Sequence, residues 1–161
     1  MRIVRDIAGY LMGLMLFVAL VPAIMWWVAG GAHPTTPRLV VFAVMAVTGI
    51  GLSVWSIVYM RLVGRGNPMD AFNHEVAPRT SALMTEGPYR ICRNPMLLGM
   101  LVYYLGVVIL LASPRATLVF VAYCLIMAVQ VRAEEARLEQ DFGEEYRQYC
   151  ARTKRLIPFV W

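Results

Sequence analysis

One short segment of this sequence gathers residues suited to binding polar groups, directly before a long apolar run. The segment reads Gly87-Pro88-Tyr89-Arg90-Ile91-Cys92-Arg93-Asn94-Pro95. Its two arginines and its tyrosine can bind anionic and aromatic groups, and its prolines restrict the backbone that carries them. A second charged cluster surrounds Glu134 and Glu135, beyond two further apolar stretches. Polar groups at the end of a hydrophobic bundle indicate an enzyme that brings a water-soluble cofactor to a lipid-like substrate.

The composition is typical of a membrane protein. Of the 161 residues, 60% are apolar and 16% are charged, whereas soluble domains are about 25% charged. A block of about 20 apolar residues predicts a transmembrane helix. We therefore predict an all-α integral membrane protein, a single membrane domain over 1–161, with four transmembrane helices: 7–28, 39–60, 96–112 and 116–131. The last two are short, which suggests a thinned bilayer or helix ends that reach into a cavity.

The distribution of charge predicts the orientation. If all four blocks cross, 13 of the 15 basic residues lie on one side, with Arg38 and Arg115 opposite. Basic residues favour the inner side, so both termini are expected to be cytosolic. All ten acidic residues lie on that side too, so the net charge of +5 indicates no nucleic-acid partner. We expect an integral plasma (inner) membrane protein of a prokaryote, with its active site facing the cytosol.

The segments outside the blocks have distinct expected roles. Residues 61–95 form a cytosolic loop that carries the first motif, and a loop of this length usually serves binding. Residues 132–161 form cytosolic C-terminal helices, separated at Gly143, a plausible helix end. Ser113-Pro114-Arg115 predicts a tight turn, which makes the last two blocks an antiparallel hairpin.

The first block leaves two questions open. Small residues at 29–32 permit cleavage as a signal peptide, but the apolar stretch is about twice the length of a signal core. Gly9 and Gly13 form a Gly-x-x-x-Gly pair that lets helices approach closely. We favour a contact inside the bundle; a homodimer through these glycines is the alternative, and no oligomer is required.

Cysteines and histidines carry little chemistry here. The three cysteines give no disulfide framework. Arg93 can lower the pKa of the adjacent Cys92, although an ordinary residue in a turn is the favoured interpretation. His33 and His74 belong to no cluster with metal-ligand spacing, so we predict no metal.

The predicted hairpin has a consequence for the two motifs. It folds residue 95 back beside residue 132, so Arg93 and Asn94 should meet Glu134 and Glu135. Charged groups at the edge of a membrane bundle are costly unless they are paired or used. The alternatives are a belt of salt bridges and an active site.

The motifs occur in a fixed order over residues 61–161. They are Leu83-x-Thr85-x-Gly87-Pro88-Tyr89-x-x-x-Arg93-Asn94-Pro95-x-x-x-Gly99, then Glu134-Glu135-x-x-Leu138-x-x-x-Phe142-Gly143-x-x-Tyr146-x-x-Tyr149, then Arg152 and Ile157-Pro158-Phe159. In this order and with these gaps they resemble the isoprenylcysteine carboxyl methyltransferase family, which belongs to a wider group with the phospholipid N-methyltransferases. The sequence departs from the family at Asn94, where histidine is frequent, and at Leu97, where tyrosine is frequent.

The resemblance implies a methyltransferase that uses S-adenosyl-L-methionine and acts on a lipid or lipidated substrate from the bilayer. It implies cofactor binding by Gly87, Tyr89, Arg93, Asn94, Glu134 and Glu135. The predicted substrate site consists of Arg152, Tyr146 and Tyr149, and Arg93 and Arg152 are the predicted catalytic residues. Asn94 cannot titrate, so a proton-transfer role at that position is not expected.

The chemistry favours one acceptor class. An arginine can bind both oxygens of a carboxylate, and a carboxylate acceptor needs no base. An amine acceptor must lose a proton, for which a glutamate is the candidate. We therefore predict isoprenylcysteine-like carboxyl O-methylation, with a phospholipid N-methyltransferase as the alternative. A sterol-reductase-like enzyme binding NADPH through the basic run Arg152–Arg155 and a non-catalytic membrane scaffold are less favoured.

Overall fold

The computed structural model describes residues 14–31, 34–64 and 82–157, and every regular element in this part of the chain is a helix. Its elements in chain order are the π-helical η1 (Leu14–Leu20), α2 (Val21–Ala29), α3 (Thr36–Tyr59), the π-helical η2 (Met60–Gly64), the 3₁₀ turn η4 (Gly87–Arg90), α4 (Pro95–Leu111) and α5 (Pro114–Arg152). The predicted all-α fold class is confirmed over these residues.

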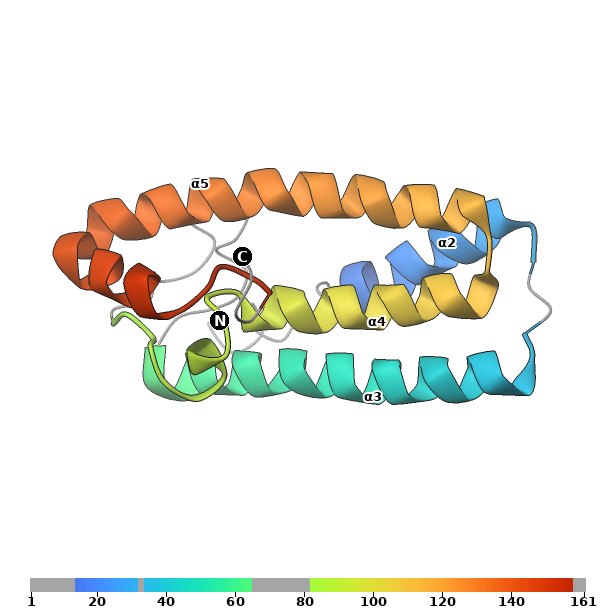
Figure 1. Ribbon diagram of the computed structural model, residues 1–161, viewed down its shortest axis with the longest axis horizontal. Coiled ribbons are helices and arrows are strands. Elements are labelled where there is room, and N and C mark those ends of the chain that lie inside the picture. Colours follow the sequence, from blue (N-terminus) through green and yellow to red (C-terminus); the bar gives the residue numbers. More distant parts are fainter. Residues whose placement is uncertain (1–13, 32–33, 65–81, 158–161) are drawn as a thin grey trace, which may run out of the picture.

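Prolines and one unusual alanine define where the long helices begin and turn. Pro37, Pro95 and Pro114 lie in the first two positions of α3, α4 and α5, where a missing N–H costs no hydrogen bond. Ala112 adopts a left-handed φ of 45° after α4, and its N–H donates to the carbonyl of Val108 at 2.8 Å. The chain therefore reverses within two residues, and α4 and α5 run antiparallel (Figure 1).

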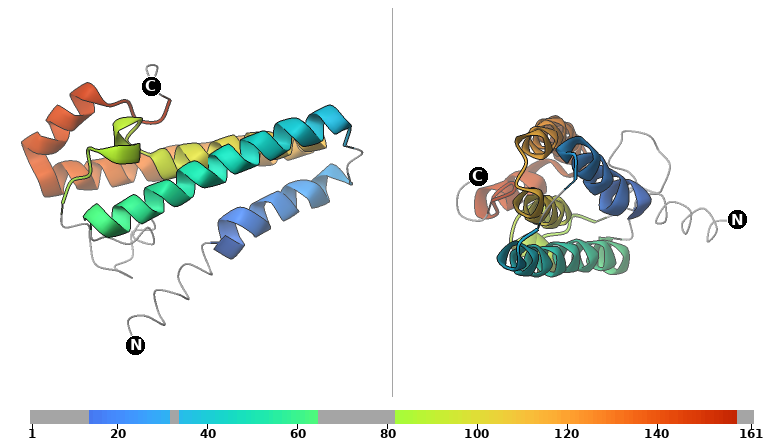
Figure 2. Two further views of the ribbon diagram at one scale, coloured as in Figure 1. Left: turned by 90° about the horizontal axis from the view of Figure 1, so that it is seen from below. Right: turned by 90° about the vertical axis from the view of Figure 1, so that its right-hand side faces the viewer.

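The long helices lie side by side. Figure 1 shows α4 between α3 and α5, and the end view in Figure 2 shows α2 against the side of this layer, next to α5. The main core sits between these helices and consists of Met25, Met100, Tyr103, Tyr104, Val107, Leu111 and Ala116. The α4 helix is thus the central element, and its first residue follows Asn94 of the first motif directly.

Two tyrosines of α4 fix the position of the first helical segment. The hydroxyl of Tyr104 donates to the carbonyl of Phe17 at 2.6 Å, and that of Tyr103 donates to the carbonyl of Val18 at 3.1 Å. Both carbonyls belong to η1, whose wide turns leave backbone oxygens accessible to side chains. These hydrogen bonds satisfy two phenols that are otherwise buried in an apolar core.

The outer surfaces of α3 and α5 are strongly apolar. Exposed residues on them include Val40, Val44, Val47 and Val54 on α3 and Leu118, Leu125 and Val129 on α5. Two helical stretches, Thr36–Gly64 and Pro114–Arg152, are long and apolar enough to cross a membrane. The apolar stretches Met15–Ala29 and Pro95–Leu111 are shorter, so crossing by all four helices and the side on which the termini lie stay predictions.

Helix boundaries differ from the expected ones in two places. The helical backbone of α3 continues through η2 to Gly64, into the predicted loop 61–95. The predicted span 116–131 is part of the 39-residue helix α5, which kinks at Gly143, where φ is 52° and ψ is −119°. The kink turns the C-terminal part of α5 back toward the start of α4 (Figure 2). Gly9, Gly13, His33, His74, Pro158 and Phe159 lie outside the described residues.

Candidate active site

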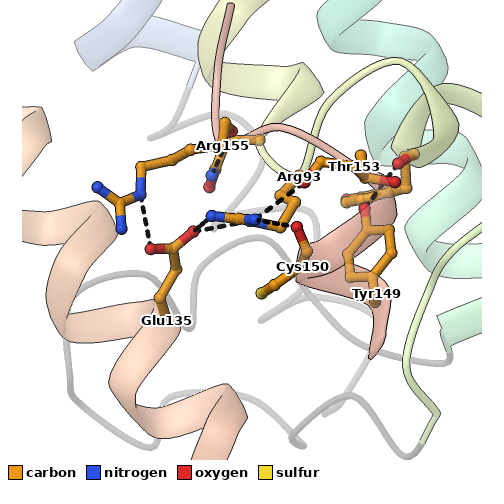
Figure 3. Close-up of polar contacts among 8 residues, drawn as sticks. Arg93, Glu135, Tyr149, Cys150, Thr153 and Arg155 are labelled. Carbon is orange, nitrogen blue, oxygen red and sulfur yellow. Dashed lines mark hydrogen bonds and ion pairs between the residues drawn. The ribbon is translucent and has the colours of Figure 1, made fainter. Parts of the chain in front are cut away.

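Arg93 and Glu135 form a close ion pair at the end of the bundle where α4 begins. The Nη2 and Oε1 atoms are 2.7 Å apart, and Nε donates to the same oxygen at 2.9 Å (Figure 3). Each side chain is only 12% exposed, so water screens the pair weakly. The predicted meeting of the first motif with this carboxylate is therefore observed.

The rest of the Arg93 guanidinium holds the chain that follows the kink of α5. Its Nη1 donates to the carbonyls of Thr153 at 2.9 Å and Cys150 at 3.3 Å. The backbone N–H of Arg93 donates to the carbonyl of Lys154 at 2.8 Å. All three guanidinium nitrogens thus have partners within the protein, and Arg93 fastens residues 150–154 to the start of α4.

A second arginine completes the network from the other side of the carboxylate. Arg155 Nε lies 2.7 Å from Oε2 of Glu135. The side-chain amide of Asn94 donates to the backbone carbonyl of Arg155 at 3.0 Å. Asn94 therefore fixes the returning chain through its amide, a function that needs no titratable ring. We call Arg93, Asn94, Glu135 and Arg155 the polar network.

Beside the polar network lies an aromatic cluster, which we define as Tyr59, Tyr89, Phe142, Tyr146 and Tyr149. The Tyr149 hydroxyl donates to the Tyr89 carbonyl at 2.6 Å (Figure 3). This hydrogen bond joins the 3₁₀ turn η4 to the part of α5 beyond the kink. Tyr59, at the end of α3, packs against Tyr89 with ring centroids 6.1 Å apart, so three segments of the chain meet here.

Gly87 is required where η4 starts. Its φ is +61°, a conformation that costs little only for glycine. A Cβ at this position would lie 2.6 Å from Cε2 of Tyr59. The glycine of the first motif therefore allows the chain to pass directly over an aromatic ring.

Tyr146 and Tyr149 are equally buried, at 3% exposure, but their hydroxyls differ. Whereas Tyr149 donates to Tyr89, the Tyr146 hydroxyl is buried and has no hydrogen-bond partner among the residues that the structure describes. The two rings pack edge to face with centroids 6.3 Å apart.

Two of the predicted charged site residues, Glu134 and Arg152, lie outside the polar network. Glu134 is half-buried, and its negative charge acts on the phenol of Tyr89. Arg152 is exposed at the end of α5, where its Nε donates to the carbonyl of Gln148, one turn earlier, at 3.4 Å. The structure thus brings Arg93, Asn94 and Glu135 together and leaves Arg152 at the surface.

Burial and charge set the protonation of the groups around Arg93. Burial alone lowers the pKa of Arg93, but the hydrogen bond and negative charge of Glu135 outweigh it, and the pKa is raised. Burial raises the pKa of the Cys92 thiol to about 11, although the backbone of Asn94 and the charge of Arg93 act in the opposite direction. Because Cys92 is fully buried, desolvation outweighs the lowering of its pKa by Arg93, which agrees with the favoured interpretation of an ordinary residue.

Arg155 is the site residue that sequence reasoning missed. It belongs to the basic run considered for binding a phosphate, yet it pairs with Glu135. The signal that could have found it is the excess of arginines over carboxylates expected at this end of the bundle. Among the described residues no group of three His, Cys, Asp or Glu side chains is arranged to hold a metal, and metal independence stays a prediction.

Comparison with known proteins identifies the family. A family model described as phospholipid methyltransferase matches residues 37–145. The protein-S-isoprenylcysteine O-methyltransferase B of Arabidopsis thaliana is 35% identical over 79 residues, which cover 48% of this chain and 40% of the plant protein. The protein-S-isoprenylcysteine O-methyltransferase of Schizosaccharomyces pombe is 29% identical over 106 residues, 63% of this chain and 45% of the yeast protein. That of Mus musculus is 31% identical over 93 residues, 55% of this chain and 33% of the mouse protein.

These relatives also correct one expectation. They come from a plant, a fission yeast and a mouse, so the prediction of a prokaryotic inner-membrane protein is wrong. The physical reason is that a bias of basic residues orients helices in a membrane but does not identify the membrane or the kind of cell.

The alignments cover only part of each protein, and this limits what can be concluded from them. The alignments cover less than half of each of these relatives. The predicted resemblance is confirmed, and with it the prediction of a methyltransferase enzyme at the level of the family. Because the family model covers more than half of the sequence, from α3 past the kink of α5, the chain belongs to the phospholipid methyltransferase family.

Proposed function

We propose that this protein is a membrane-embedded methyltransferase that uses S-adenosyl-L-methionine and acts on a lipophilic acceptor, most like isoprenylcysteine carboxyl O-methylation. The observation that carries the proposal is the ion pair between Arg93 and Glu135. It joins the two motifs of the family resemblance into one polar network at the end of apolar helices. The printed names of the relatives support this reaction class.

The residues present fit this cofactor. S-adenosyl-L-methionine carries a carboxylate, an ammonium group, a ribose diol and an adenine, and it supplies a methyl group on a sulfonium ion. The polar network offers both signs of charge, and the aromatic cluster offers flat rings and one buried hydroxyl with no partner. We assign Gly87, Tyr89, Asn94 and Glu134 to the cofactor site. Arg93 and Glu135 belong to the same proposed site: their contacts to the protein fix its shape, and they present both signs of charge to the ligand.

The acceptor side is proposed at Arg152, which is exposed at the end of α5. The exposed guanidinium of Arg152 is free of carboxylate contacts among the described residues, and its planar fork suits a carboxylate. Holding two reactants in line accounts for much of the rate of a group transfer. A carboxylate acceptor is already anionic, so the chain needs only to orient it and exclude water.

Methylation of a phospholipid amine is the second candidate, because the matching family model bears that description. An amine must lose a proton before it attacks, which requires a base. Both carboxylate oxygens of Glu135 are already engaged by guanidinium groups, those of Arg93 and Arg155. Glu134 is therefore the base that this reaction would use.

We propose that all four predicted blocks cross the membrane and that both termini lie on one side. In this arrangement the polar network lies where α4 begins and near the last part of α5. The 17-residue α4 is about 26 Å long at 1.5 Å per residue, which is less than a typical hydrocarbon core of about 30 Å. The start of α4 would therefore lie below the membrane surface, where a lipid chain can approach it sideways.

Ligand binding tests the class of enzyme. Purified protein in detergent, titrated in a calorimeter, is expected to bind S-adenosylhomocysteine and not NADPH. Binding of NADPH alone would favour the reductase-like alternative. Binding of neither ligand would favour a non-catalytic membrane scaffold.

The acceptor is tested with labelled methyl groups. Protein in vesicles is given methyl-labelled S-adenosyl-L-methionine with either N-acetyl-S-farnesylcysteine or phosphatidylethanolamine. A carboxyl methyl ester releases its label as methanol in alkali, whereas an N-methyl group keeps it. We expect alkali-labile label on the farnesylcysteine, and alkali-stable label on the amine lipid alone would establish the second candidate.

A further inference from the structure

The hydroxyl of Tyr146 is a buried polar group that the described part of the protein leaves without a hydrogen bond. It lies within the aromatic cluster, 3% exposed as a residue, and has no hydrogen-bond partner among residues 14–31, 34–64 and 82–157. A buried hydroxyl without a partner destabilises the folded chain. Such a group is therefore expected to have a partner in some functional state of the protein.

Tyr149 is a nearby tyrosine whose buried hydroxyl does form a hydrogen bond. It lies three residues further along α5, is equally buried, and donates to the Tyr89 carbonyl at 2.6 Å. The same residue type in the same cluster thus has a structural hydrogen bond in one case and none in the other. The difference points to a ligand for Tyr146.

The charges around Tyr146 restrict the chemistry of that ligand. Burial, the negative charge of Glu135 and the neighbouring Cys150 thiol raise the pKa of the phenol, while the positive charge of Arg93 lowers it. The hydroxyl is therefore neutral at physiological pH and can act as a donor. Because Arg93 and Glu135 form an ion pair, the surroundings of the hydroxyl present both signs of charge and suit a group that carries both.

We propose that Tyr146 binds the zwitterionic amino-acid end of the methyl donor, donating a hydrogen bond from Oη to its carboxylate. This inference rests on the proposed function and deepens it. The donor's ammonium group then faces the carboxylate of Glu135, and its carboxylate faces the phenol and Arg93. Since the hydroxyl is sealed from solvent, the neighbouring side chains must move apart when the ligand binds.

The experiment compares two ligands and two variants. S-adenosylhomocysteine carries the amino-acid end, and 5′-methylthioadenosine keeps the adenosine and thioether without it. The affinities of both ligands are measured for wild type, Tyr146→Phe and Tyr149→Phe, together with the thermal midpoint in detergent without ligand.

We expect Tyr146→Phe to weaken binding of S-adenosylhomocysteine by about tenfold, the loss of one hydrogen bond to a charged group, and to leave 5′-methylthioadenosine unchanged. Its thermal midpoint should equal or exceed that of wild type, since the variant removes an unpaired polar group. Tyr149→Phe should lower the midpoint because the Tyr89 carbonyl loses its donor.

Four results for Tyr146→Phe would overturn the inference. The affinities for both ligands could be unchanged, or both could be weakened equally. The thermal midpoint could be as low as that of Tyr149→Phe while the affinities stay normal, or the variant could raise only the KM for the acceptor. Each of these leaves wild-type binding of S-adenosylhomocysteine intact, so the proposed function survives. If wild type binds neither ligand, the proposed function fails together with the inference.

Discussion

Gly49 of α3 and Gly99 of α4 face each other across the contact between the two helices, backbone against backbone. A Cβ on Gly49 would lie 2.8 Å from the backbone nitrogen of Tyr103, and one on Gly99 would lie 2.9 Å from that of Ser53. The Ser53 hydroxyl donates to the carbonyl of Met96 at 3.0 Å in the same contact. These small residues set how closely α4, and with it Arg93, approaches α3.

Alanine at either glycine should therefore destabilise the bundle. Because the obstructing atoms are backbone, Gly49→Ala and Gly99→Ala should each cost about 1–3 kcal/mol through overpacking, measured as the thermal midpoint in detergent. Gly51 is the matched control, since nothing lies within 4 Å of its Cβ position. Gly51→Ala should be neutral or stabilising by up to about 1 kcal/mol, as expected for alanine in a helix, and a Gly49→Ala variant as stable as this control would contradict the contact.

Breaking the buried ion pair should affect both stability and binding. Arg93→Ala leaves the Glu135 carboxylate with one guanidinium and releases the carbonyls of residues 150 and 153. We expect a loss of about 3–5 kcal/mol, as for removal of one partner of a buried pair, and loss of S-adenosylhomocysteine binding. Glu135→Gln keeps the shape and removes the charge, so it should also abolish binding.

Arg147 provides the control for the ion pair. It lies near Glu139 and Glu144, with all three side chains more than half exposed. Arg147→Ala should change stability by less than about 1 kcal/mol and leave binding unchanged. If Arg93→Ala and Arg147→Ala behave alike in calorimetry and thermal unfolding, the polar network has no special role.

Arg152 separates acceptor recognition from cofactor binding. Since it lies outside the polar network, Arg152→Ala should leave the affinity for S-adenosylhomocysteine unchanged and reduce methyl transfer strongly, with a higher KM for a carboxylate acceptor. Radiolabel transfer and calorimetry on the same preparation check this. A loss of cofactor affinity would place Arg152 in the cofactor site instead.

The buried Cys92 predicts a dependence of stability on pH. Its folded-state pKa of about 11 exceeds the ordinary value of 9.0, so above pH 9 the unfolded chain loses the proton first. The stabilisation that the buried, protonated thiol provides is fully present below pH 9 and is lost as the pH rises toward 11. The thermal midpoint of wild type should fall over this range, and that of Cys92→Ala should fall less steeply. The fall in each protein is measured relative to its own midpoint at pH 8. Equal slopes in the two proteins would contradict a buried, protonated thiol.

The fold was predictable where local signals were strong. Apolar blocks bounded by Pro37, Pro95 and Pro114 predicted long helices at nearly the observed positions. The turn around Ser113 predicted that the chain reverses, and counting residues along the two arms placed Arg93 near Glu135. Both inferences depend only on where the turn lies and on the number of residues on each side of it, which can be counted in the sequence.

The remainder of the site depends on tertiary structure. The partners of Arg93 include the carbonyls of Cys150 and Thr153, and backbone carbonyls have no signature in a sequence. Their position depends on the kink at Gly143, where the positive φ of 52° is a conformation that glycine adopts readily. The contact of Gly49 with Gly99 was missed because neither glycine has a second glycine four residues away in its own helix. The close approach is evident only when the two helices are packed together.

The hydrogen bond from Arg93 to Thr153 spans 60 residues of chain. During biosynthesis the arginine leaves the ribosome before its partners at residues 150–154 have been synthesised. The polar network can therefore assemble only after α4 and α5 have formed their hairpin. A chain shortened before residue 153 would keep its apolar helices and still lack a completed site.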